Sequence, residues 1–112
     1  MKLQDFDFRI WDNKTNKFIE LNISYNIRAI PRKNDDLVLE LWSGFYDSKG
    51  TKIYEGDIVI CNTLKFVVEY KRVKFILRQI AENGLSVSLH YSETLEVLGN
   101  IHENADLLKE QK

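Results

Sequence analysis

The chain is poor in the residues that build disulfide-bonded, zinc-binding or membrane-spanning proteins. Its 112 residues include one cysteine, Cys61, and one proline. A single cysteine excludes an internal disulfide and a zinc site made of several cysteines, and it is typical of a reducing compartment. No segment approaches the roughly 20 consecutive apolar residues that cross a bilayer. Asp5, Asp7 and Arg9 interrupt the N-terminal segment before a hydrophobic signal region could form. The sequence therefore predicts a cytoplasmic protein with no membrane partner.

An excess of either charge is also lacking. The chain has 16 Lys and Arg residues and 17 Asp and Glu residues, for a net charge of −1. The molecule as a whole has no field that would attract a polyanion. Apolar residues make up 44% of the chain, which is the composition of a packed globular protein and excludes a disordered one. Since 112 residues suit one hydrophobic core, we expect a single domain over residues 1–112.

Several segments alternate between apolar and polar residues, as half-buried strands do. The segment DFDFRIWD, residues 5–12, alternates in this way and is followed by turn-forming residues, so residues 5 to about 25 are expected to form a hairpin. Pro31 marks an exposed connection. Further along, Leu37, Leu39 and Leu41 are expected opposite Val38, Glu40 and Trp42.

Glycine is scarce as well, and its five positions predict turns and close contacts. Gly50 is expected to close a hairpin with positive φ, and Gly56 to form a tight bend in which Asp57 accepts a backbone N–H. Asn83-Gly84 predicts another hairpin, and Gly99 a bulge or close backbone approach.

These features predict a mainly β fold, within the β-rich α+β class. Antiparallel hairpins would form small, partly open barrel-like sheets, followed by a short C-terminal helix. We expect Asn104 to cap that helix, and Leu107 and Leu108 to dock it.

Two groups of residues offer catalytic or metal chemistry, and each has a simpler interpretation. Glu55 and Asp57 would suit a hard cation, but no further acidic ligands follow at loop spacing, and a turn already explains Gly56 and Asp57. Cys61 with His90 or His102 would need a lowered thiol pKa, yet Cys61 lies in an apolar strand. We therefore expect no enzymatic activity, no metal and no cofactor.

A local basic stretch leaves nucleic-acid binding open as an alternative. Residues 65–80 contain five Lys and Arg residues and one Glu, for a net charge of +4. Aromatic residues are interleaved with them, a mixture that can hold phosphates and stack bases. The competing interpretation is a solvated hairpin whose aromatic side chains point inward, and alternation favours it. The candidate contacts are Tyr70, Lys71, Arg72, Lys74 and Phe75.

Three stretches resemble the YopX family of small phage and prophage proteins. They are FRIWD at 8–12, SGFYDSKGTKIYEGDIV at 43–59 and LEVLGNIHENADLL at 95–108. The middle stretch is the specific one. The family more often has Thr in place of Ser43 and Tyr in place of His102, so the resemblance gives His102 no special role. The family-signature positions are Trp11, Asp12, Gly44, Asp47, Gly50, Ile53, Tyr54, Glu55, Gly56, Asp57, Gly99, Asn100 and Glu103.

The resemblance implies a phage-encoded, mostly β protein in the bacterial cytoplasm that forms an oligomer, and it implies no known reaction. Independently, Trp11, Trp42 and Tyr54 are of the residue types enriched at interaction surfaces. Bulky residues on both sides of residues 37–46 exceed what one small barrel buries, which favours self-association. We therefore expect a protein that acts by binding, as a homo-oligomer, with an unknown phage or host protein as a further partner.

Overall fold

The computed structural model describes residues 5–19, 36–81 and 83–109, and within them the chain forms two antiparallel sheets. The first has the strand order β2-β1-β3-β4. Its strands are β1 (Phe8–Asp12), β2 (Lys17–Phe18), β3 (Leu37–Tyr46) and β4 (Lys52–Tyr54). The second has the order β8-β7-β6-β5-β9. Its strands are β5 (Asp57–Cys61), β6 (Leu64–Lys71), β7 (Lys74–Gln79), β8 (Ser86–Ser88) and β9 (Glu96–Asn100). The predicted mainly β class is confirmed.

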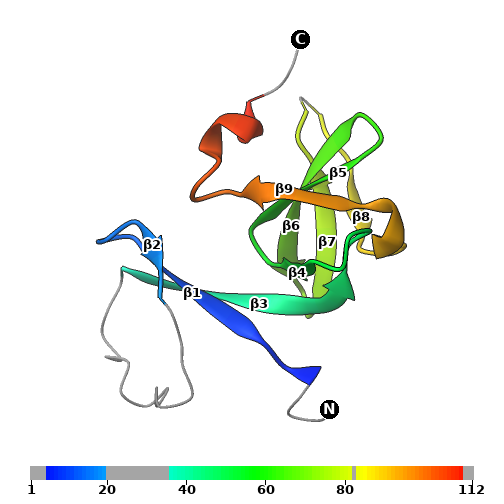
Figure 1. Cartoon of the computed structure of the whole chain (residues 1–112). Coiled ribbons are helices and arrows are strands. Elements are labelled where there is room, and N and C mark those ends of the chain that lie inside the picture. The colour runs from blue at the N-terminus through cyan, green and yellow to red at the C-terminus, as the bar shows by residue number, and fades with distance from the viewer. Residues whose placement is uncertain (1–4, 20–35, 82, 110–112) are drawn as a thin grey trace.

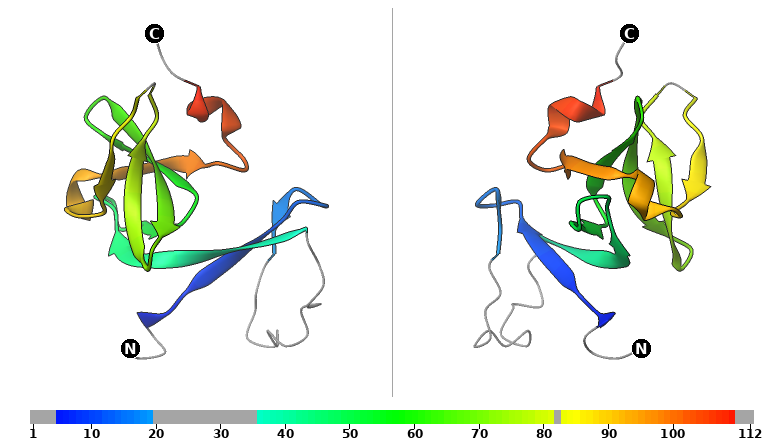
Figure 2. Two further views of the ribbon diagram at one scale, coloured as in Figure 1. Left: turned by 180° about the vertical axis from the view of Figure 1, so that it is seen from behind. Right: turned by 45° about the vertical axis from the view of Figure 1, so that its right-hand side comes forward.

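The second sheet curls into a half-barrel, and β4 lies at one end of it (Figure 1). Strand β3 begins beside the β1–β2 hairpin, which projects to one side, and ends at the half-barrel (Figures 1 and 2). The β1–β2 pairing confirms the first part of the predicted hairpin. Its remainder and the predicted connection at Pro31 lie outside the described residues.

The hydrophobic core lies inside the half-barrel. Strand alternation places Val59, Val68 and Leu77 on its concave face, where they pack with Ile53 from β4. The opposite, convex face carries Ile58 and Val67, which pair with each other and are also buried. Both faces of β5 and β6 are therefore covered, one by the core and the other by the first sheet and the C-terminal segment.

The first sheet turns its charged face inward. Arg9 pairs with Glu40 across β1 and β3, and Trp11 pairs with Val38, on the face directed at the half-barrel. The other face carries Phe8, Ile10, Leu37, Leu39 and Leu41. Leu39 is 55% exposed and the neighbouring Glu40 only 2%. The alternation was predicted correctly, but the buried side of β3 is the one that contains the glutamate.

The predicted turns are confirmed at several points. Gly50 and Gly56 have φ of +81° and +87°, and β7 pairs with β8 on either side of the Asn83-Gly84 turn. The β5–β9 register shifts next to Gly99. A side chain on Gly99 would collide with the Asn104 side chain, so the close approach expected there is present.

The C-terminal helix is a single 3₁₀ turn, η4 (Ala105–Leu108). Another 3₁₀ turn, η3 (Ser92–Thr94), precedes β9. Asn104 is the N-cap residue of this turn, as predicted, and its carbonyl accepts the Leu107 N–H at 2.9 Å. Its side chain forms no capping bond, because Asn104 Oδ1 accepts a hydrogen bond from the Asn100 backbone N–H at 3.1 Å. Its side chain therefore stabilises the end of β9 and is not available to the following turn. Leu108 remains partly exposed.

Candidate functional site

The bend at Gly56 connects the two sheets. Its N–H donates to the Val68 carbonyl at 2.8 Å, and its own carbonyl accepts from Ile101 N–H at 2.9 Å. Asp57 Oδ2 accepts the Tyr54 N–H at 2.8 Å, as the sequence predicted. The Glu40 carboxylate occupies the position that a Cβ on Gly56 would take. A glycine is therefore required here both for its φ and for the space it leaves to Glu40.

Arg9 is the cation at the centre of this junction. Its Nε contacts Glu40 Oε1 at 2.9 Å and its Nη2 contacts Asp57 Oδ1 at 2.8 Å. Nη2 also donates to the Glu55 carbonyl at 3.2 Å. The guanidinium lies 4.8 Å from the Phe18 ring centroid and 4.9 Å from that of Tyr54. One arginine thus joins β1, β3 and the β4–β5 bend, in a geometry suited to its planar set of donors.

His102 joins the C-terminal segment to the same cluster. Its Nε2 lies 3.1 Å from Glu40 Oε2. Its ring stacks on Trp11 at 4.6 Å between centroids, with an interplanar angle of 10°. The family resemblance gave His102 no special role, whereas the structure places it on the buried glutamate. We call Arg9, Glu40, Asp57 and His102 the junction cluster.

Burial shifts the proton equilibria of the acids at the junction. Desolvation raises the pKa of Asp57 to about 6, although the charge of Arg9 and the hydrogen bond from Tyr54 N–H act against this shift. Desolvation also raises the pKa of Glu55, opposed by the hydrogen bond from Leu41 N–H and aided by the nearby charge of Glu40. These shifts have a structural cause, and raised acid pKa values alone do not identify a catalytic site.

A second polar group borders the junction at Asp7. Asp7 Oδ2 accepts hydrogen bonds from the Tyr54 hydroxyl at 2.6 Å and from Lys52 Nζ at 2.8 Å. Burial acts to raise the pKa of Asp7, but these bonds, together with one from Phe8 N–H, hold it below its ordinary value. Burial and the Asp7 charge raise the pKa of the Tyr54 hydroxyl. Tyr54 therefore serves as a donor.

Two further signature residues, the acid Asp47 and the amide Asn100, organise turns through their side chains. Asp47 Oδ1 accepts the N–H groups of Lys49 at 2.9 Å and Thr51 at 2.8 Å, and Oδ2 accepts that of Val97 at 2.9 Å. Burial acts to raise the pKa of Asp47, and these three bonds hold it below its ordinary value. Asn100 Oδ1 accepts the N–H groups of His102 and Glu103, and its Nδ2 donates to Glu103 Oε1 at 2.9 Å.

The remaining signature residues also have structural contacts. Trp11 is buried and its Nε1 donates to Asn13 Oδ1 at 2.8 Å, while Asp12 Oδ1 accepts the Lys14 N–H. Ile53 is fully buried in the core, and Gly44 has φ of +86° within β3. The signature residues therefore form or stabilise the turns, the core and the junction between the sheets.

The basic stretch forms the β6–β7 hairpin, whose turn contains Arg72 and Val73. Its candidate residues do not share one surface: Tyr70 pairs with Phe75 on the concave face, while Lys71 pairs with Lys74 on the convex face. The two rings lie 4.8 Å apart, and Phe75 packs against the core. The inward arrangement that alternation favoured is therefore present for Phe75, whereas Tyr70 remains partly exposed.

The other candidate set, Cys61 with a histidine, is not assembled. Cys61 Sγ contacts Thr94 Oγ1 at 3.9 Å, and His102 contacts Glu40 instead. Across residues 5–19, 36–81 and 83–109, no three His, Cys, Asp or Glu side chains are grouped so as to hold a metal ion. Among the same residues, no helix is long and apolar enough to cross a membrane.

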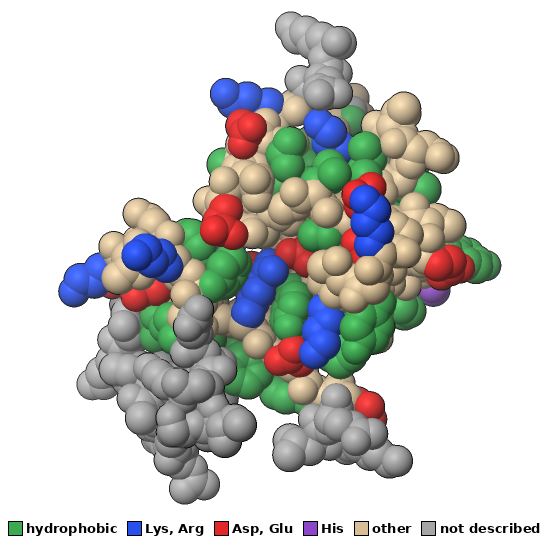
Figure 3. All heavy atoms as spheres, in the orientation of Figure 1, with side chains coloured by type: hydrophobic (Ala, Val, Ile, Leu, Met, Phe, Trp, Pro, Cys, Tyr) green, Lys and Arg blue, Asp and Glu red, His purple; other side chains and the backbone are tan. Residues whose placement is uncertain are grey.

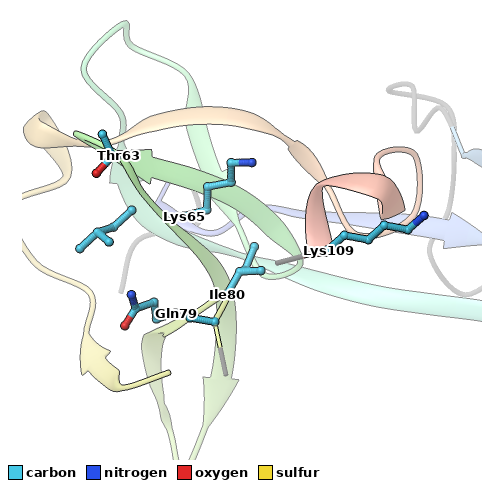
Figure 4. Close-up of a pocket in the computed structure, with 7 residues that line it drawn as sticks. Thr63, Lys65, Gln79, Ile80 and Lys109 are labelled. Atoms are coloured by element: carbon cyan, nitrogen blue, oxygen red, sulfur yellow. The ribbon is translucent and has the colours of Figure 1, made fainter. Parts of the chain in front are cut away.

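Two of the cavities in the described part of the chain involve residues discussed above or a pair of lysines. The larger, of about 380 Å³, lies between β3, the Glu55–Gly56 bend, the convex face of β6 and the C-terminal segment. Charged side chains of both signs lie among hydrophobic ones at the centre of the molecule, where the sheets meet (Figure 3). The smaller, of about 170 Å³, involves Lys65 and Lys109, but Lys109 points away from Thr63 and Gln79 and the two lysines do not converge (Figure 4).

Sequence reasoning missed Arg9, Glu40 and His102 as members of one cluster. A signal was present, because Arg9 and Glu40 are charged residues in otherwise apolar alternating strands. Only the three-dimensional pairing of β1 with β3, 31 residues apart at this point, shows that they meet.

Comparison with known proteins identifies the family of the chain and a solved structure with a similar fold. No curated protein matches the chain. Among solved structures, the crystal structure of protein EF1440 from Enterococcus faecalis is similar, with a TM-score of 0.68 and 20% identity over 93% of this chain and 98% of that one. At this identity the likeness shows a shared fold. The family model described as YopX protein matches residues 22–109, a range that includes the second and third stretches quoted above and begins after FRIWD. The chain therefore belongs to the YopX family.

Proposed function

We propose that this protein is a phage or prophage accessory protein that acts by binding, without catalysis, and assembles with copies of itself in the bacterial cytoplasm. The observation that carries the proposal is the reversed first sheet. Its charged face is directed at the half-barrel, and its apolar face, with Leu39 more than half exposed, is directed outward.

An outward face of this composition supports self-association. Phe8, Ile10, Leu37, Leu39 and Leu41 form five neighbouring apolar positions on two paired strands, and Asp12 is the charged residue at their end. Of the five, Leu39 is the exposed one, Ile10 is buried, and the other three are half-buried. Exposed Phe6 lies next to Phe8, with 5.7 Å between ring centroids. A two-fold contact would place this neutral face against itself and leave few charges unpaired.

The partners of three acids at and beside the junction support a role without catalysis. Asp57 is held by Arg9 and the Tyr54 N–H, Glu40 by Arg9 and His102, and Asp7 by Lys52 and Tyr54. A side chain engaged in this way stabilises the bend and the sheet junction. Its oxygens are already occupied as acceptors.

Sedimentation velocity at micromolar concentration tests the proposal. We expect the wild type to sediment as an oligomer and Leu39→Glu as a monomer, because the substitution places a charge in the proposed interface. Leu85→Glu is the matched control, since Leu85 is 72% exposed on the loop between β7 and β8. A monomeric wild type, or an oligomeric Leu39→Glu protein with native circular dichroism, would contradict the proposal.

A second candidate function is nucleic-acid binding at the β6–β7 hairpin. The observation in its favour is that Lys71, Arg72 and Lys74 are all exposed around one turn. Binding of this kind would weaken steeply with salt, and replacing all three residues by Gln would flatten that dependence. Fluorescence anisotropy with a labelled oligonucleotide at low salt measures it, and no binding there would remove this candidate.

A further inference from the structure

We propose that the larger cavity binds a primary ammonium or guanidinium group carried on an aliphatic stem. Its volume of about 380 Å³ lies within the range of about 300–1,000 Å³ typical of small-ligand sites.

The walls of the cavity suit an aliphatic stem. Val38 of β3, Val67 of β6, and Ile101 and Leu108 of the C-terminal segment all line it. Val67 is buried on the convex face of the half-barrel, and Val38 lies on the inward face of the first sheet. Three segments, distant in sequence, thus supply apolar surface to a single space, and burial of methylene groups against such surface is favourable.

The carboxylates of the cavity suit a cation at the end of that stem. Glu40, Glu55 and Glu69 all line it. Glu40 is paired with Arg9 and His102, and Glu69 with Arg78 at 3.1 Å. Glu55 differs: in the described part of the chain no Lys, Arg or His nitrogen lies within ion-pair distance of its carboxylate, whose Oε1 accepts only a long bond of 3.4 Å from Leu41 N–H.

Another carboxylate oxygen at the cavity lacks a hydrogen-bond donor. Glu69 Oε1 is buried and has no hydrogen-bond partner, although it forms a long ion pair with Lys71 Nζ at 3.5 Å. A buried acceptor without a donor is costly, so a ligand that brings N–H groups would be favoured there. Lys71 and Arg78 also line the cavity, but both are paired with Glu69, so Glu55 is the lining acid without an ion pair in the described part of the chain.

This site is separate from the proposed self-association surface. Val38 and Glu40 line the cavity from the inward face of β3, whereas Leu39 and Leu41 lie on the outward face. Ligand binding therefore does not depend on the oligomer, and either proposal can fail without the other.

Two-dimensional ¹H–¹⁵N NMR titration of the full chain tests the inference with three probes. These are n-butylammonium, neutral n-butanol, and a blocked Gly-Gly-Lys-Gly-Gly peptide. We expect n-butylammonium to shift the amides of Val67, Glu69 and Ile101 and to bind at least tenfold more tightly than n-butanol, because a charge-assisted hydrogen bond adds to the burial of the stem. Glu55→Gln should weaken the ammonium probe about tenfold, whereas Glu93→Gln, on exposed η3, should not.

Each outcome decides the inference. Binding of both amines shows that the cavity accepts a lysine side chain of a partner protein. Binding of n-butylammonium alone assigns the site to a free small amine. Equal binding of amine and alcohol, unchanged binding in Glu55→Gln, or shifts confined to other residues would overturn it. Should Glu55→Gln lose its native spectrum, the comparison of amine and alcohol on the wild type still decides.

Discussion

At the scale of single residues, Gly56 combines two requirements that can be separated by mutation. Its φ of +87° disfavours any L side chain, and the Glu40 carboxylate fills the space of a Cβ. Gly50 has a similar φ of +81° but open space around it. Gly50→Ala should therefore report backbone strain alone, about 1 kcal/mol. We expect Gly56→Ala to lower the free energy of unfolding by at least about 2 kcal/mol, since the junction cluster must also move.

Urea denaturation of the two variants measures the difference. Equal losses of stability in Gly50→Ala and Gly56→Ala would show that the Glu40 contact is unimportant, and that the bend needs glycine only for its backbone conformation.

Asp57 gives the second prediction at this scale, on pH. Its pKa is about 6 in the folded protein against an ordinary value of 3.8, so the folded state holds this proton more tightly than the unfolded state does. The contribution of Asp57 to stability is thus largest below about pH 4 and is lost as the pH rises to about 6. Asp7 and Asp47, with lowered pKa values, act with the opposite sign and lose their contribution as the pH falls.

Carboxyl ¹³C NMR titration checks this directly. We expect the Asp57 resonance to titrate near pH 6 and that of Asp47 below pH 3.8. An Asp57 midpoint at its ordinary value would contradict this prediction and mean that the Arg9 pair and the hydrogen bonds fully offset burial.

At the scale of elements, the first sheet is attached to the half-barrel through Arg9. Replacement by Met keeps the aliphatic stem but leaves Glu40 and Asp57 buried without their shared cation. The expected cost is about 3–5 kcal/mol, the usual penalty for removing one partner of a buried ion pair. Lys49→Met is the control, since the Lys49–Glu96 pair is exposed and should matter little. Chemical denaturation at pH 7 compares them, and similar midpoints would contradict this account of the junction.

The β6–β7 turn contains a conformational strain that a mutation can relieve. Arg72 and Val73 have φ of +52° and +64°, as in the turn type that favours Asn-Gly. A β-branched residue is poorly suited to this conformation, and Val73 is 86% exposed, so its side chain contributes little burial. We expect Val73→Gly to raise the free energy of unfolding by about 1 kcal/mol. Val87→Gly, within β8, should lower it, and a loss of stability in Val73→Gly would show an unrecognised contact.

The elements also show how far sequence reasoning reaches. Local hydrogen bonding and glycine conformation predicted the bend at Gly56, the role of Asp57 in it, the turn at Gly50 and the close approach at Gly99. Alternation predicted strands β3 and β7 but not which side of β3 is buried. A period of two assigns residues to two faces, but it does not say which face is directed at the core. The inward position of Glu40 follows from its pairing with Arg9 and His102, contacts that span 31 and 62 residues.

At the scale of the whole molecule, self-association should make stability depend on concentration. If an oligomer forms through the outward face of β1 and β3, mass action raises the apparent midpoint of urea unfolding as the protein concentration increases. We expect this rise for the wild type and for Leu85→Glu, and its absence for Leu39→Glu. Fluorescence-detected unfolding over a hundredfold range of concentration measures it, and a constant wild-type midpoint would argue for a monomer.

The Asp47 carboxylate has a consequence for the order of events during synthesis. One of its oxygens is satisfied within the turn, by Lys49 and Thr51, while the other has its partner at Val97, fifty residues later. On a ribosome the turn can close early, but its second oxygen lacks this partner until β9 has emerged. The half-barrel is therefore completed by its last strand, and a nascent chain truncated before β9 lacks the donor that joins this turn to the sheet.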